Sequence, residues 1–106
     1  MIEGSVIDEA AKRLLDAAPP GSGVIVFGSY ARGTAGPSSD LDFLVIEPRV
    51  ANQYEEMVRL RDVLRDVPAS VDVLVTSHNT FAEWRDTPNN VLYEAWKEGL
   101  RFGEVG

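Results

Sequence analysis

Acidic side chains occupy alternate positions at the start of one short apolar segment. Asp40 and Asp42 flank Leu41, and the apolar run continues to Ile46. Because side chains alternate across a β-strand, both carboxylates are expected on one face of the strand and Leu41 on the other. Two carboxylates that lie close together repel each other unless a cation lies between them. Taken alone, the spacing fits either a cation site or the solvent-exposed face of an amphipathic strand.

A third acid lies inside another apolar segment. Asp72 stands between Val71 and Val73, and an unpaired carboxylate is costly to bury, so this aspartate is a poor choice for stability alone. If this segment is a strand next to that of Asp40 and Asp42, the three acids converge on one spot. Oxygen ligands that carry dense negative charge suit Mg²⁺ or Mn²⁺ rather than zinc.

A glycine and a serine end the apolar run that precedes the acid pair. Gly28 lets the backbone approach a ligand closely, and Ser29 offers a hydroxyl and, at the start of a helical turn, free backbone N–H groups. Such groups suit phosphate oxygens. Arg32 is the one cation of this loop, and it either contacts a phosphate or pairs with an acid at the surface. Together with the acids, this arrangement predicts phosphoryl or nucleotidyl transfer assisted by two metal ions.

These residues need strands and helices to bring them together. The pattern of apolar residues predicts strands at 24–27, 41–46 and 71–76, helices at 6–18, 51–66, 81–85 and 88–99, and one helical turn at 29–32. The first connection between strands holds only that turn, so the first two strands should pair antiparallel. The second connection holds a full helix, so the second and third strands should run parallel. The expected fold is an α/β (α+β) domain in which helices pack against a small mixed β-sheet.

Composition narrows the function classes. The chain has 106 residues, no cysteine and a formal net charge of −7, which predicts a single domain over 1–106 without a disulfide framework or a thiolate metal site. The acidic balance argues against sequence-independent binding of long nucleic acids, which needs many Lys and Arg contacts to phosphates. No apolar run approaches the length of a membrane span and no secretory signal pattern is present, so we expect a cytoplasmic protein that does not bind membranes.

The segments VFGSYARG (26–33) and SDLD (39–42) resemble the minimal nucleotidyltransferases of the DNA polymerase β superfamily. The signature of these enzymes is Gly-Ser, ten residues and Asp-x-Asp, and Gly28, Ser29, the residues 30–39, Asp40 and Asp42 match it. The family triad is completed by a third acid on a later strand, which Asp72 matches. The resemblance covers nearly the whole chain and implies a polymerase β-like nucleotidyltransferase fold.

The resemblance also implies an activity and roles for the matching residues. Members of the family transfer a nucleoside monophosphate, usually AMP from ATP, to a hydroxyl acceptor. On this basis Ser29 holds the triphosphate, Asp40 and Asp42 bind two Mg²⁺ ions, and Asp72 binds the catalytic ion and helps to activate the acceptor. The sequence itself carries no pattern that specifies the base of the nucleotide.

Many short members of the family are antitoxins encoded with a HEPN-domain ribonuclease toxin, and some transfer AMP to a tyrosine of the toxin. The resemblance therefore implies a HEPN-type toxin as partner and acceptor. A small-molecule acceptor is less expected, because the sequence shows no further domain of the kind that larger relatives use to bind one. Two alternatives stay open: a binding module that neutralises its partner without catalysis, and a small-molecule nucleotidyltransferase with a separate acceptor-binding subunit.

Other polar and aromatic residues have more than one interpretation. His78, the single histidine, is either a proton carrier or ligand near the site or a polar loop residue before a short helix. The helical spacing of four aromatic residues favours the core or a partner interface over a base-stacking platform: Phe81, Trp84, Tyr93 and Trp96. The helix expected at 51–66 combines apolar positions, Val58 and Leu60 among them, with a charged face exposed to solvent.

Overall fold

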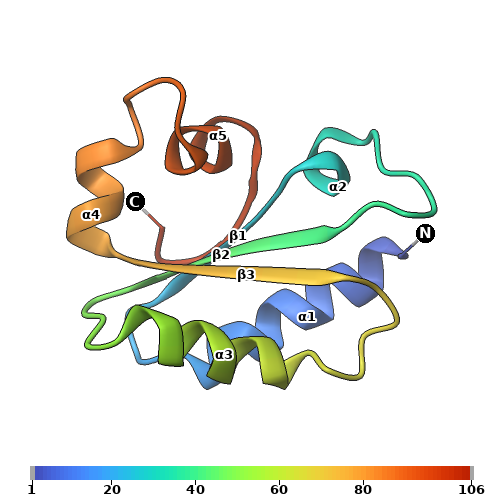
Figure 1. The fold of residues 1–106 in the computed structure, drawn as a ribbon, viewed down its shortest axis with the longest axis horizontal. Coiled ribbons are helices and arrows are strands. Elements are labelled where there is room, and N and C mark those ends of the chain that lie inside the picture. Colours follow the sequence, from blue (N-terminus) through green and yellow to red (C-terminus); the bar gives the residue numbers. More distant parts are fainter. Residues whose placement is uncertain (1, 106) are drawn as a thin grey trace.

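A mixed four-stranded β-sheet forms the centre of the chain. The computed structural model describes residues 2–105. The sheet has the order β3-β2-β1-β4 and consists of β1 (Gly23–Phe27), β2 (Leu41–Glu47), β3 (Val71–Ser77) and β4 (Leu100–Gly103). The helices are α1 (Gly4–Ala17), α2 (Ser29–Arg32), α3 (Gln53–Val63), α4 (His78–Trp84) and α5 (Val91–Glu98). Helices α1 and α3 cover one face of the sheet, and α2, α4 and α5 lie on the other (Figure 1).

The strand directions follow the lengths of the connections. β1 and β2 pair antiparallel, and β2 and β3 pair parallel across α3, as the sequence predicted. The fourth strand was not expected: β4 follows α5 directly and pairs antiparallel with β1, with Val24 opposite Phe102. Its four residues, Leu-Arg-Phe-Gly, are too few to show a clear alternation. The sheet therefore ends in β3 on one side and in β4 on the other.

Both faces of the sheet are covered, which explains why its strands are almost continuously apolar. Alternate residues of β1, β2 and β3 pack under α1 and α3, where the buried side chains include Val26, Phe43, Val73, Leu14 and Leu60. The opposite face packs against α4 and α5 through a smaller cluster: Ile25, Leu44, Ile46, Phe81, Ala95 and Val105. Because the smaller cluster covers only part of its face, the remainder of that face stays open next to α2.

Polar capping residues decide where three of the helices begin. Side-chain oxygens of Asn52, Ser77 and Asn90 accept hydrogen bonds from backbone N–H groups in the first turns of α3, α4 and α5. These N–H groups have no partner inside a helix, so a capping side chain fixes the start. The helices expected at 51–66, 81–85 and 88–99 accordingly cover 53–63, 78–84 and 91–98. Within residues 2–105, none of the helices combines the length and apolarity that crossing a bilayer requires.

Helix α3 presents apolar side chains on two sides. Leu60 is fully buried against the sheet, whereas Val58, expected among the apolar positions of this helix, is 52% exposed. Charged residues of the helix that are exposed to solvent include Glu55, Arg59 and Asp62. Arg59 Nε lies 2.8 Å from Oε1 of the partly buried Glu56, and Arg65 Nη1, just beyond the helix, lies 3.5 Å from Asp62 Oδ2. The solvated charged face is thus confirmed, and it lies beside a second, exposed apolar stripe.

Candidate active site

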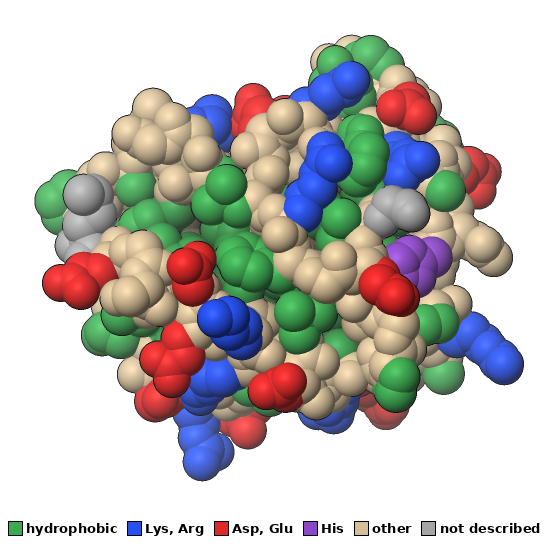
Figure 2. Space-filling model, turned by 180° about the vertical axis from the view of Figure 1, so that it is seen from behind, with side chains coloured by type: hydrophobic (Ala, Val, Ile, Leu, Met, Phe, Trp, Pro, Cys, Tyr) green, Lys and Arg blue, Asp and Glu red, His purple; other side chains and the backbone are tan. Residues whose placement is uncertain are grey.

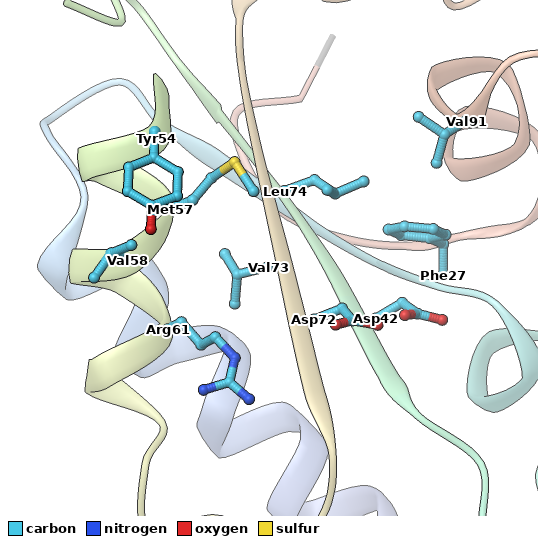
Figure 3. A pocket seen from close by; sticks show the side chains of 10 residues that line it. All are labelled: Phe27, Asp42, Tyr54, Met57, Val58, Arg61, Asp72, Val73, Leu74 and Val91. Atoms are coloured by element: carbon cyan, nitrogen blue, oxygen red, sulfur yellow. The ribbon is translucent and has the colours of Figure 1, made fainter. Parts of the chain in front are cut away.

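Asp42 and Asp72 lie side by side on the open part of the sheet. The parallel register of β2 and β3 places these two residues directly opposite each other, and Figure 3 shows their carboxyl groups next to each other. Asp72 is exposed, because the buried Val71 and Val73 point to the opposite face of the strand. The sequence argument from the cost of burying Asp72 was therefore wrong. It is the carboxylate of Asp42, only partly exposed, whose burial costs free energy.

The surroundings of Asp42 favour its protonated form. Burial, followed by the charges of Asp72 and Asp40 and a hydrogen bond with Asp72, raises the pKa of Asp42 to about 6, while the charge of Arg32 lowers it. Desolvation and nearby like charges both disfavour a carboxylate, and a bound cation relieves both effects. The site therefore has the electrostatics of a cation site.

Asp40 stands just outside the strand, in the exposed chain that precedes β2. Its charge contributes to the raised pKa of Asp42, but within residues 2–105 no three His, Cys, Asp or Glu side chains are grouped closely enough to hold a metal ion together. The structure thus brings two of the three predicted acids into contact and the third into electrostatic range. Mg²⁺ is typically held by one or two protein carboxylates together with phosphates and waters. The acids fit an Mg²⁺ ion that arrives with a phosphate-bearing ligand.

Gly28 connects this acid pair to α2. It has a left-handed backbone with φ of 77°, and a Cβ at this position would overlap Oδ2 of Asp42, so only glycine fits here. Ser29, the first residue of α2, is partly exposed, and its carbonyl accepts a hydrogen bond from the N–H of Thr34 at 2.9 Å. The turn therefore places the Ser29 hydroxyl and the first backbone N–H groups of α2 at the end of β1, next to the acids.

Arg32 lies at the end of α2 and makes the acidic contact that was one of its two expected roles. Its Nη1 is 3.1 Å from Oε2 of Glu98 in α5, with both side chains substantially exposed. An exposed ion pair of this kind contributes little to stability. Its positive charge nevertheless lies near enough to Asp42 to lower the pKa of that carboxyl, against the larger effects that raise it.

The other candidates lie away from the acids. His78 begins α4 at the opposite end of β3 from Asp72, its Nε2 is 2.8 Å from the carbonyl oxygen of Gly21, and its side chain, purple in Figure 2, reaches the surface. It is therefore part of a structural contact. Phe81 is buried and packs edge-on against Trp96, which confirms a core role for these two, whereas Trp84 is exposed.

A groove of about 350 Å³ adjoins the acid pair, and sequence reasoning missed it (Figure 3). Its lining includes Asp42 and Asp72, and it extends to Tyr54, Val58 and Arg61 of α3. These three residues follow one another at intervals of four and three, which places them on one side of the helix. That spacing was the available signal, and it was hidden because Val58 was grouped with Leu60, which is buried, among the apolar positions of the helix.

The sequence profile of the nucleotidyltransferase domain family matches residues 7–99. The chain belongs to this family. The three candidate aspartates, Asp40, Asp42 and Asp72, and the Gly-Ser turn lie within the matched residues, so the predicted resemblance is confirmed. No curated protein matches the chain in sequence.

Solved structures agree on the fold. The domain is similar to a chain in a crystal structure of a toxin–antitoxin with AMP-PNP, with a TM-score of 0.64 and 19% identity over 91% of this chain and 73% of that chain. It is also similar to a chain in a crystal structure of a mutant of the toxin–antitoxin MntA-HpeT, with a TM-score of 0.60 and 17% identity over 97% of this chain and 74% of that chain. The mixed sheet with its helices is therefore the polymerase β-like nucleotidyltransferase fold.

Proposed function

We propose that this nucleotidyltransferase transfers AMP from ATP, together with Mg²⁺, to a hydroxyl group of a partner protein. The observation that carries the proposal is the contact between the carboxyl groups of Asp42 and Asp72 beside the turn at Gly28. The acid pair needs a cation to offset its repulsion, and the Gly-Ser turn suits phosphate oxygens. An Mg²⁺–triphosphate complex meets both requirements.

The residues divide between the nucleotide and the acceptor. The hydroxyl of Ser29 and the backbone of Gly28 and α2 bind the triphosphate, and Arg32 adds positive charge near the phosphates. Asp40 and Asp42 would hold two Mg²⁺ ions, and Asp72 would help to hold one of them. When bound, the ions offset the negative charge of the acids and of the phosphates, and so favour the charge that develops during transfer.

The transfer itself is a substitution at the α-phosphorus of ATP. The acceptor oxygen forms a new P–O bond, the bond to pyrophosphate breaks, and Asp72 takes the proton of the acceptor hydroxyl. Asp72 suits this role because it is exposed and lies on the edge strand β3, where an acceptor from another molecule can reach it. Asp42 is flanked by strands on both sides and is less accessible.

We propose a toxin as the partner, specifically a HEPN-type ribonuclease that accepts AMP on a tyrosine. The similarity in fold to chains of two toxin–antitoxin crystal structures, one of them with AMP-PNP, supports a toxin as partner and an adenine nucleotide as substrate. The HEPN type and the tyrosine rest on the family resemblance of the sequence.

The test is transfer of label from ATP to the partner. The domain is incubated with Mg²⁺, ATP labelled at the α-phosphate and the protein encoded by the neighbouring gene, and we expect label on that protein. Asp42→Asn should abolish labelling, whereas the matched Asp62→Asn, on the exposed side of α3, should leave it intact. If the two proteins form a complex and no label is transferred, the proposed activity is wrong.

A binding module without catalysis is the second candidate, because three hydrophobic side chains that line the groove are exposed: Tyr54, Val58 and Val91. Such side chains mark surfaces that bind partners. The Asp42→Asn variant separates the two candidates. Retained binding with lost neutralisation of the partner favours catalysis, and retained neutralisation favours the binding module.

A further inference from the structure

The groove next to the acid pair crosses the open edge of the sheet. On one side of β3 it is lined by Phe27, Leu74 and Val91, and on the other by side chains of α3 (Figure 3). Because β3 is the outermost strand of the sheet, no other strand separates the two halves of the groove. A ligand in it therefore lies along the outer edge of β3 and contacts both halves.

The order of the strands assigns this groove to the acceptor side of the site. Gly28 and Ser29 follow β1, Asp42 lies on the central strand β2, and Asp72 lies on β3. A triphosphate bound at the Gly-Ser turn therefore lies at the β1 end of the groove, next to Phe27, and the part of the groove over β3 lies on the other side of Asp42. Attacking and leaving oxygens are roughly in line in phosphoryl transfer, so an acceptor that approaches from the groove has the required direction.

The outer edge of β3 is capped at two points and open between them. Nε2 of Gln53 donates to the carbonyl oxygen of Val75 at 2.6 Å, and Nε of Arg61 donates to that of Val71 at 3.0 Å. In a strand with one neighbour, the backbone groups of alternate residues point outward, so the N–H and C=O of Val73, midway between the caps, face the groove. A short extended segment can form main-chain hydrogen bonds there.

The side chains of the groove specify the chemistry of that segment. Tyr54 is 75% exposed and Val58 52% exposed, and exposed apolar surface of this kind suits apolar side chains of a partner. No carboxylate of residues 2–105 pairs with Arg61, and only its Nε is engaged, by Val71, so its terminal Nη groups can bind an acidic side chain. Across β3 from Arg61, the carboxylate of Asp72 can accept a hydrogen bond from a hydroxyl group (Figure 3).

We propose that the groove over the edge of β3 binds an extended segment of the partner protein. This segment carries the acceptor hydroxyl next to apolar residues, with an acidic residue at Arg61. The inference rests on the proposed function, and it adds the surface and the kind of peptide that the enzyme recognises. Phosphates on one side of Asp42 and the peptide on the other make the acid pair the meeting point of the two substrates.

A pair of matched variants tests the groove. Val58→Glu introduces a negative charge into the groove, and Leu100→Glu introduces the same charge on β4, at the opposite edge of the sheet. Because Val58 is 52% exposed and Leu100 is 49% exposed, neither change should disturb folding. With the protein encoded by the neighbouring gene as the probe, Val58→Glu should weaken the complex about tenfold or more. Leu100→Glu should change it less than about twofold. Equal effects of the two variants would overturn the proposal.

Photocrosslinking identifies the occupant. With p-benzoyl-phenylalanine in place of Val58, we expect crosslinks to one extended segment of the partner that contains a hydroxyl side chain. Crosslinks to a surface that has no hydroxyl side chain overturn the proposal. It is also overturned if Val58→Glu weakens AMP-PNP binding as much as it weakens partner binding, because the groove then holds the nucleotide. Crosslinks to the expected segment without transfer of label refute the proposed function alone, whereas transfer at wild-type rate by Val58→Glu refutes the groove alone.

Discussion

Replacing Glu47 by glutamine should remove a large pH dependence of stability. Glu47 ends β2, is 2% exposed, and has one carboxyl oxygen, Oε2, without a hydrogen-bond partner. Burial, together with a hydrogen bond to Glu56 and the charge of Glu56, raises the pKa of Glu47 from 4.5 to about 8. Glu56 itself is held as a carboxylate by two hydrogen bonds of 2.8 Å from Arg59. At neutral pH the pair therefore consists of a protonated Glu47 and an ionised Glu56.

The raised pKa fixes the sign of the effect. Between pH 4.5 and about 8 the folded chain keeps the proton of Glu47 and the unfolded chain loses it. The stabilisation of the folded chain by the proton of Glu47 is complete below pH 4.5. It is lost as the pH rises through 8, at about 1.4 kcal/mol per pH unit. Between pH 6 and pH 8 the free energy of unfolding should fall by about 2 kcal/mol through this group. The pKa of Glu56 is lowered to about 2, so this residue titrates outside that range.

Urea denaturation at pH 6, 7 and 8, followed by tryptophan fluorescence, measures the effect. In Glu47→Gln the neutral amide keeps the volume of the side chain and can donate a hydrogen bond to Glu56, so the fall with pH should disappear. Glu55→Gln, at an exposed position in the first turn of α3, serves as the control and should retain the wild-type slope. Parallel pH profiles for wild type and Glu47→Gln would refute the reasoning.

Three further substitutions probe the site and the core. Asp42→Asn should stabilise the chain at pH 8 but not at pH 4, because the pKa of Asp42 is raised to about 6 and its ionisation above that pH opposes folding; urea denaturation at both pH values checks this. Gly28→Ala should destabilise by about 1–3 kcal/mol in the same assay and weaken AMP-PNP binding, since the new Cβ is strained and displaces Asp42. Leu14→Ala, at a fully buried position of α1, should lower the free energy of unfolding by about 2–5 kcal/mol without changing nucleotide affinity.

The sequence predicted those parts of the fold that depend on strong local patterns. The apolar runs located three strands, and the lengths of the connections gave their directions, because a single helical turn cannot carry the chain through a parallel crossover. β4 was missed since its four residues owe their strand conformation to pairing with β1. The starts of α4 and α5 were misplaced because they depend on capping by Ser77 and Asn90, whereas the apolar pattern alone indicated other boundaries.

The site was predictable as a set of residues but not in its details. Alternation and strand pairing indicated that Asp42 and Asp72 meet, and their register confirms it. Exposure could not be read from neighbours in sequence: Asp72 lies between two buried valines and is itself exposed, because only one face of β3 is covered at this point. The groove depends on how far α5 extends over the sheet and on which side of α3 faces the edge of β3, and these are properties of tertiary packing.

The register of β3 against β2 makes the acid pair a product of correct folding. If β3 slipped by one residue, its side chains would exchange faces, so that Asp72 would lie beneath α1 and α3 and the valines at 71, 73 and 75 would lose their contacts with that core. A misregistered chain is thus expected to be much less stable than the correctly paired one. The enzyme needs no separate step to organise these carboxylates, and a substitution that loosens the valine core is expected to impair catalysis from a distance.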